Sequence, residues 1–102
     1  MITEYTICAL PEGNINYQHY AITVSYRGED RWAVCSGPFC FGTDGNGGWE
    51  WDYEPSPSNR DDDWLGRNRF DEQTALQLAE EQAPRMTCNG ITVTEAMKRA
   101  ER

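Results

Sequence analysis

The residues of this 102-residue chain that could carry out chemistry are four cysteines, one histidine and many carboxylates. A structural zinc site needs four nitrogen or sulfur ligands, usually supplied as closely spaced pairs. Cys35 and Cys40 are loosely spaced for such a pair, and Cys8, Cys88 or His19 would have to complete the site from distant segments. No motif places a nucleophile beside His19. The spacing therefore favours small buried thiols over a metal centre, and a structural or solvated histidine over a catalytic one.

The carboxylates do not form a recognisable cation site. Asp61, Asp62 and Asp63 are consecutive, so their side chains point in different directions and do not converge on a divalent ion unaided. Asp44 begins a stretch that resembles a calcium-binding loop, but the final glutamate of that motif is missing. Solvated charge is the favoured interpretation. No phosphate-binding loop, dinucleotide glycine motif or nucleophile elbow is present either, so no cofactor is expected.

The most distinctive segment is residues 49–70, which holds three of the four tryptophans and six carboxylates. Large rings beside acidic groups are typical of a recognition surface, because rings supply contact area at little cost in rotamer entropy. We therefore predict a partner-binding region in which rings anchor the contact and carboxylates steer it. The predicted anchors are Trp49, Trp51, Tyr53 and Trp64, and the predicted steering residues are Glu50, Asp52, Glu54, Asp61, Asp62 and Asp63.

The same segment also fits a structural role. Its strict alternation predicts a strand with Trp49, Trp51 and Tyr53 on one face and three carboxylates on the other. The ringed face would then pack on a helix while the acidic face meets water. We favour this arrangement over a fully exposed aromatic patch, because monomers rarely expose large apolar surfaces.

Composition limits the class of partner. The formal net charge is −8, which argues against direct binding to nucleic acid or an anionic membrane and favours a protein partner with a basic surface. The aromatic content is too high for a disordered acidic tail, so one folded domain over residues 1–102 is expected. The start of the chain shows no signal-peptide or membrane-spanning pattern, so we expect a cytoplasmic protein with reduced thiols.

The first two-thirds of the chain reads as β-structure. Residues 4–10 are a short strand-type run, and residues 20–26 and 31–35 alternate across the turn Arg27–Asp30 as an antiparallel hairpin does. Residues 39–41 and 49–54 add two further candidate strands. The prediction is therefore an antiparallel sheet of three to five strands.

The last third reads as helical. Ser58 is expected to cap a short helical turn over residues 60–65 that Gly66 ends, and Asp71 to cap a main helix over residues 72–83. Thr92 begins a capping box for a shorter helix over residues 93–101. Strands followed by helices predict an α+β fold in which the main and C-terminal helices pack on one face of the sheet.

Four segments together resemble uncharacterised small proteins encoded by actinobacterial phages and actinobacterial genomes. They are His19–Gly28, Trp51–Pro55, Arg69–Asp71 and Asn89–Val93. The resemblance agrees with a composition in which Lys98 is the one lysine among nine basic residues. It implies a phage-borne protein in a host cytoplasm, and it supplies no activity and no site residue.

Our main hypothesis is a non-enzymatic protein–protein interaction module that acts on a host protein. One alternative is a DNA mimic, in which a continuous row of carboxylates imitates phosphates and inhibits a DNA-binding protein. A second is a small hydrolase or metal-dependent enzyme that uses carboxylates of residues 44–63. A third is a homodimer in which the tryptophan-rich strand forms the subunit contact.

Overall fold

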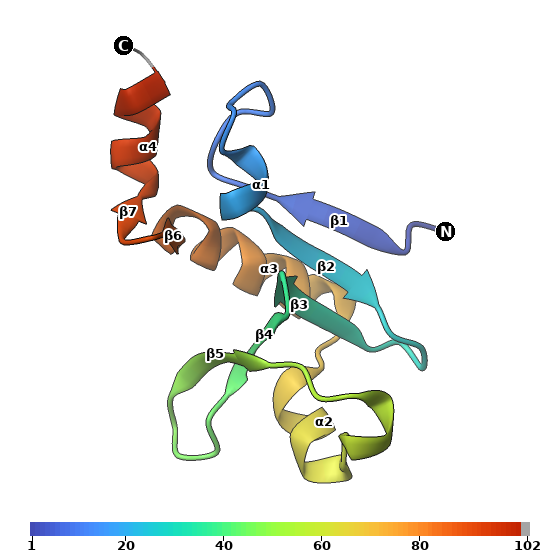
Figure 1. Cartoon of the computed structure of the whole chain (residues 1–102). Coiled ribbons are helices and arrows are strands. Elements are labelled where there is room, and N and C mark those ends of the chain that lie inside the picture. Colours follow the sequence, from blue (N-terminus) through green and yellow to red (C-terminus); the bar gives the residue numbers. More distant parts are fainter. Residues whose placement is uncertain (101–102) are drawn as a thin grey trace.

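The fold is seen in a computed structural model that describes residues 1–100. Five antiparallel strands form one sheet in sequence order, which confirms the α+β prediction (Figure 1). The strands are β1 (Glu4–Ile7), β2 (Ile22–Tyr26), β3 (Trp32–Ser36), β4 (Phe39–Thr43) and β5 (Trp49–Tyr53). Because the order is a simple meander, β1 and β5 are the two edges of the sheet.

The predicted β2–β3 hairpin is confirmed, but the strand begins later than the alternation indicated. Val24 pairs with Val34, and both are fully buried. Tyr20, which continues the alternating pattern of β2, is instead the last residue of a short helix, α1 (Tyr17–Tyr20). Its hydroxyl donates to the carbonyl oxygen of Ile91 at 2.9 Å. Tyr20 is therefore held by a partner 71 residues away, a contact that a local pattern cannot report.

The main helix, α3 (Glu72–Gln82), forms as predicted. The Asp71 side chain accepts a hydrogen bond from the backbone nitrogen of Thr74 at 2.8 Å, the geometry of an N-cap. Ala75 and Ala79 are fully buried against β2 and β3, where their small side chains allow the helix to approach the sheet closely. A 3-10 turn, Ala83–Arg85, follows the helix and contains Pro84.

Helix α2 (Asp62–Asn68) differs from the prediction in its boundaries. Asp61 rather than Ser58 caps it, because its carboxylate accepts from the backbone nitrogen of Trp64 at 2.8 Å. Pro57 begins a separate 3-10 turn, Pro57–Asn59. Gly66 lies inside the helix rather than ending it.

Helices cover both faces of the sheet, because α2 and α3 lie on opposite sides of it. Ala33, Cys35 and Cys40 form a buried cluster with Trp64 of α2, whereas Val34 belongs to the cluster under α3. Residues Trp32–Cys35 of β3 are accordingly all buried. This placement was not part of the prediction, which considered one face only.

The C-terminal helix, α4 (Val93–Ala100), begins as predicted, with Thr92 Oγ1 accepting from the backbone nitrogen of Glu95 at 3.2 Å. It follows a two-stranded sheet of β6 (Thr87–Cys88) and β7 (Ile91–Thr92). Its predicted end at residue 101 lies outside the described residues. Its buried side chains form a cluster with Leu10 and Tyr20, so α4 packs on the segment between β1 and β2 rather than on the face covered by α3.

Figure 1 places α4 and α2 at opposite ends of the molecule. Neither these nor any other helix in residues 1–100 combines the length and apolarity that crossing a membrane requires.

Candidate functional site

The rings of β5 share one face of the sheet, as the alternation predicted. Trp49 stacks on Phe41 of β4 with ring centroids 5.3 Å apart, and Tyr53 lies 4.6 Å from Phe39. Trp51 packs on Phe41 at 5.0 Å and contacts the core under α3. Trp49 and Tyr53 keep 50% and 66% of their surface exposed. The structure thus divides the predicted anchors: Trp51 belongs partly to the core, while Trp49 and Tyr53 present ring surface to solvent.

The backbone of β5 is open along its outer edge. Within residues 1–100, β5 pairs only with β4. The Glu54 nitrogen donates to Pro38 and the Asp44 nitrogen donates to Gly48, so the even-numbered residues of β5 form the hydrogen-bonded pairs with β4. Trp49, Trp51 and Tyr53 therefore direct their N–H and C=O groups away from the sheet.

One of these outward groups already has a local partner. The Asp52 carboxylate accepts the backbone N–H of Tyr53 at 2.9 Å. Within residues 1–100, the outward residues that keep both N–H and C=O free are therefore Trp49 and Trp51.

The predicted steering carboxylates have different environments. Glu50 and Asp52 are exposed on the face of β5 opposite the rings. Asp61 caps α2, and Asp63 pairs with Arg67 one turn later at 3.4 Å. Asp62 is exposed in the first turn of the same helix. Asp61 and Asp63 thus already have partners within α2, which reduces the support for the continuous acidic row that a DNA mimic needs.

Glu54 points into the protein, where three arginines surround its carboxylate. Its oxygens lie 2.7 Å from Arg69, 3.1 Å from Arg27 and 3.6 Å from Arg60. Burial alone would raise the pKa of Glu54, but the hydrogen bond from Arg69 and the charges of Arg27 and Arg69 outweigh it and lower the pKa below its ordinary value. Glu54 therefore joins β5 to the segments that carry the three arginines.

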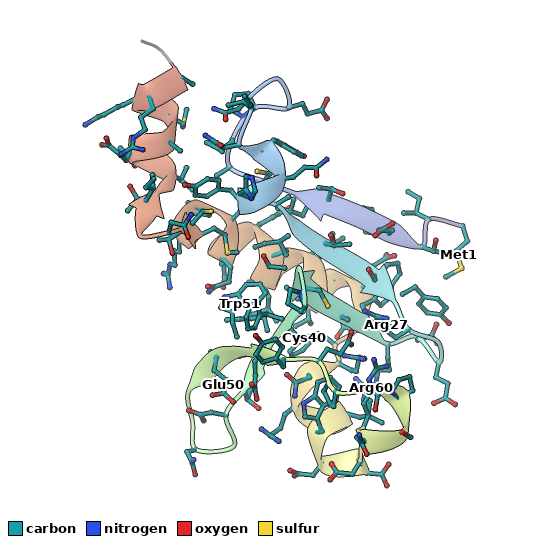
Figure 2. All side chains as sticks on the ribbon, viewed as in Figure 1. Met1, Arg27, Cys40, Glu50, Trp51 and Arg60 are labelled. Carbon is teal, nitrogen blue, oxygen red and sulfur yellow. The ribbon has the colours of Figure 1, made fainter. Side chains whose placement is uncertain are left out.

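Trp64, the fourth predicted anchor, is half-buried and covers part of this arginine cluster. The Arg69 guanidinium lies 4.9 Å from its ring centre, and that of Arg60 lies 6.0 Å away. Figure 2 shows Arg60 beside α2, and Trp51 packs on the cluster under α3 whereas Trp64 packs on the cluster of the opposite face. Trp64 is thus separated from the exposed rings of β5 by the sheet itself.

A pair of thiols lies beside Glu54, and the sequence reasoning did not identify it as a site. Cys35 of β3 is directly opposite Cys40 of β4, and their Sγ atoms are 2.9 Å apart. Arg27 Nη2 donates to Cys35 Sγ at 3.8 Å. The signal was the turn Gly37–Pro38, because a two-residue hairpin loop with positive φ at its glycine places residues 35 and 40 opposite one another.

The two thiols differ in acidity. A hydrogen bond from the Cys40 thiol and the nearby Arg27 charge lower the pKa of Cys35 to about 7, although burial opposes this. The hydrogen bond to Cys35 and burial raise the pKa of Cys40 well above its ordinary value. Cys35 is therefore the more acidic member of the pair.

The other residues considered for chemistry have structural roles or stand apart. Asp44 Oδ1 accepts from the backbone nitrogens of Asn46 at 2.7 Å and Gly48 at 3.0 Å, so its carboxylate shapes the loop before β5. These backbone hydrogen bonds hold the pKa of Asp44 below its ordinary value. His19 is exposed on α1, in a different part of the fold from the thiol pair.

The comparisons with known proteins are negative: no family model, no curated protein and no solved structure matches the chain.

Proposed function

We propose that this protein is a non-enzymatic protein–protein interaction module whose docking element is the edge of β5. The observation that carries the proposal is an open strand edge at Trp49–Trp51, flanked by the exposed rings of Trp49 and Tyr53. An extended segment of another protein binds such an edge by adding one more strand, with backbone hydrogen bonds giving affinity and alternate side chains giving specificity.

The occupant we propose is an extended, basic segment of a partner protein. Alternate side chains of an added strand would lie beside the rings of Trp49 and Trp51, and the others would lie beside Glu50 and Asp52. Lysine or arginine at the second set of positions would face these two exposed carboxylates, and the net charge of −8 would accelerate the encounter. By the resemblance of its sequence, the setting we propose is a host cytoplasm and the source a phage genome.

Charge reversal on the acidic face of β5 is expected to weaken binding without unfolding the protein. Probes are extended peptides that alternate basic and apolar residues, with acidic versions of the same length for comparison. We expect the Glu50→Lys/Asp52→Lys variant to bind the basic peptides at least tenfold more weakly, because attraction becomes repulsion at two adjacent sites. Fluorescence titration and amide exchange measure the effect, and the Trp49 and Trp51 amides should be protected in the wild-type complex.

The matched control is Glu4→Lys/Glu12→Lys, which makes the same change in net charge at exposed residues far from β5. A control variant that loses as much affinity would show that only overall charge matters and would reject the β5 site. Protection of β1 amides in place of Trp49 and Trp51 would reject it as well. A dimer in sizing chromatography with both amides protected would identify the occupant as a second copy of this chain.

A further inference from the structure

We propose that Cys35 and Cys40 form a peroxide-reactive dithiol site in which Cys35 attacks a hydroperoxide and Cys40 closes a reversible disulfide across the β3–β4 hairpin. The site lies on the opposite face of the sheet from the rings of β5 and goes beyond the docking function. It rests on the geometry of the cysteine pair and on the groups around it.

The pairing of the two strands favours a cross-link at this position. Cys40 directs its backbone groups toward β5, where it is paired with Asp52, so its pair with Cys35 is one without backbone hydrogen bonds. In such pairs the Cα atoms are typically about 4.5 Å apart, within the range that a disulfide spans. With Sγ atoms 2.9 Å apart, the two thiols are positioned to join with little movement of the backbone.

The surroundings assign different tasks to the two thiols. Both thiols belong to the cluster covered by Trp64, but Cys40 is 1% exposed, whereas Cys35 is 8% exposed and has the Arg27 guanidinium beside it. A hollow of about 310 Å³ between α2 and the β2–β3 turn is lined by Arg27 and Arg69. A small oxidant that enters this hollow meets Arg27, whose guanidinium also contacts Cys35, and the lowered pKa of Cys35 supplies the thiolate that attacks it.

The same surroundings disfavour a metal ion. Cys35, Cys40 and Glu54 offer three donor atoms within 4.8 Å of one another. However, the Glu54 carboxylate is held by Arg27, Arg60 and Arg69, and these positive charges oppose a cation. A structural zinc site also needs a fourth ligand. The positive charge of the arginines stabilises a thiolate, whereas it repels a metal cation.

The proposed reaction balances with hydrogen peroxide as oxidant. The Cys35 thiolate attacks one peroxide oxygen, the O–O bond breaks, and hydroxide leaves and takes up a proton as water. The resulting Cys35 sulfenic acid is attacked by Cys40 Sγ. The S–S bond forms, the S–O bond breaks, and the departing hydroxide takes the Cys40 proton as a second water. Two thiols have then lost two electrons and two protons, and one peroxide has become two waters.

Peptide mapping of the whole protein tests the cross-link directly. Trypsin cleaves after Arg31 and Arg60, so the peptide 32–60 contains Cys35 and Cys40 and no other cysteine. After treatment of the reduced protein with peroxide, we expect this peptide to lose two hydrogen atoms, and dithiothreitol should restore them. A disulfide that joins the peptides of Cys8 and Cys88, or an unchanged peptide 32–60 under excess peroxide, would overturn the proposal.

Single variants separate the two roles. Cys40→Ser should stop at a Cys35 sulfenic acid that dimedone traps, whereas Cys35→Ser should leave Cys40 unmodified. Circular dichroism checks the fold of each variant, and the wild-type mapping decides the cross-link if either fails to fold. Modification of Cys40 in folded Cys35→Ser would overturn the assignment of Cys35 as the attacking thiol.

The pH profile and a metal control complete the test. At pH 7 the oxidation of Cys35 should be about fivefold faster than that of an ordinary thiol, because a larger thiolate fraction outweighs its lower nucleophilicity. The rate of Cys35 oxidation should level off above about pH 7. Arg27→Gln should slow the reaction at pH 7, and Arg31→Gln, in the same hollow, should not. If the reduced protein binds one zinc ion that blocks oxidation, the site is a metal centre and the proposal fails.

Discussion

Replacing Glu54 with glutamine is expected to lower the free energy of unfolding by about 3 kcal/mol. The substitution keeps the size of the side chain and removes its charge. Arg69 is then the critical partner, because its side chain is 4% exposed and lies 2.7 Å from a Glu54 oxygen. Loss of the carboxylate leaves a buried guanidinium without its counter-charge. We choose the lower end of the range for broken buried pairs, because the Glu54 side chain keeps 16% of its exposure.

Urea unfolding at neutral pH, followed by circular dichroism, measures this effect. The matched control is Glu50→Gln, which removes an exposed charge from β5, the strand that Glu54 follows, and should change stability by less than about 0.5 kcal/mol. Equal effects of the two substitutions would contradict the ion-pair cluster around Glu54.

The same cluster makes stability depend on pH. The pKa of Glu54 is lower in the folded protein than in the unfolded chain, so the unfolded chain binds a proton more readily. The contribution of Glu54 is fully present above its unfolded pKa, near 4.3, and is lost as the pH falls through the folded pKa. We expect the wild-type protein to lose this stability on acidification below about pH 4.3, and the difference from Glu54→Gln to shrink in the same interval.

Local signals in the sequence were sufficient for the β2–β3 hairpin and for the starts of the two longest helices. The alternation around Val24 and Val34 predicted the hairpin, and Asp71 and Thr92 marked the starts of α3 and α4. Each of these signals depends on residues within a few positions of one another. The local pattern failed at Tyr20, whose hydroxyl contacts Ile91 far along the chain.

The candidate sites show the same limit. Alternation correctly placed Glu54 on the face opposite the rings, but it could not indicate that α2 covers that face and brings Arg69 to it. Cys35 and Cys40 are loosely spaced in the sequence, and the sequence does not state that their strands pair directly. Only the two-residue turn between them makes them direct neighbours. The functional interpretation of a carboxylate or a thiol in this chain therefore depended on a packing arrangement that the sequence does not state.

That packing arrangement predicts a large effect of a very small substitution, Gly42→Ala in β4. A Cβ atom at Gly42 would lie 2.6 Å from the carbonyl oxygen of Arg67 and would also overlap the side chain of Asn68, both at the end of α2. A backbone oxygen cannot move aside as a flexible side chain can, so α2 as a whole must shift. We expect a loss of about 3 kcal/mol in urea unfolding, at the upper end for overpacking by one carbon.

Gly66→Ala is the matched control, because it adds the same methyl group inside α2 itself. No atom lies within 4 Å of the position where its Cβ would be, and alanine is favoured over glycine in a helix interior by about 0.5–1 kcal/mol. The two substitutions should therefore have opposite signs. If Gly42→Ala were neutral, α2 would not rest on β4 as described. The cover that Trp64 provides over Cys35 and Cys40, and the approach of Arg69 to Glu54, would then lose their support, since both rest on the packing of α2 against β4.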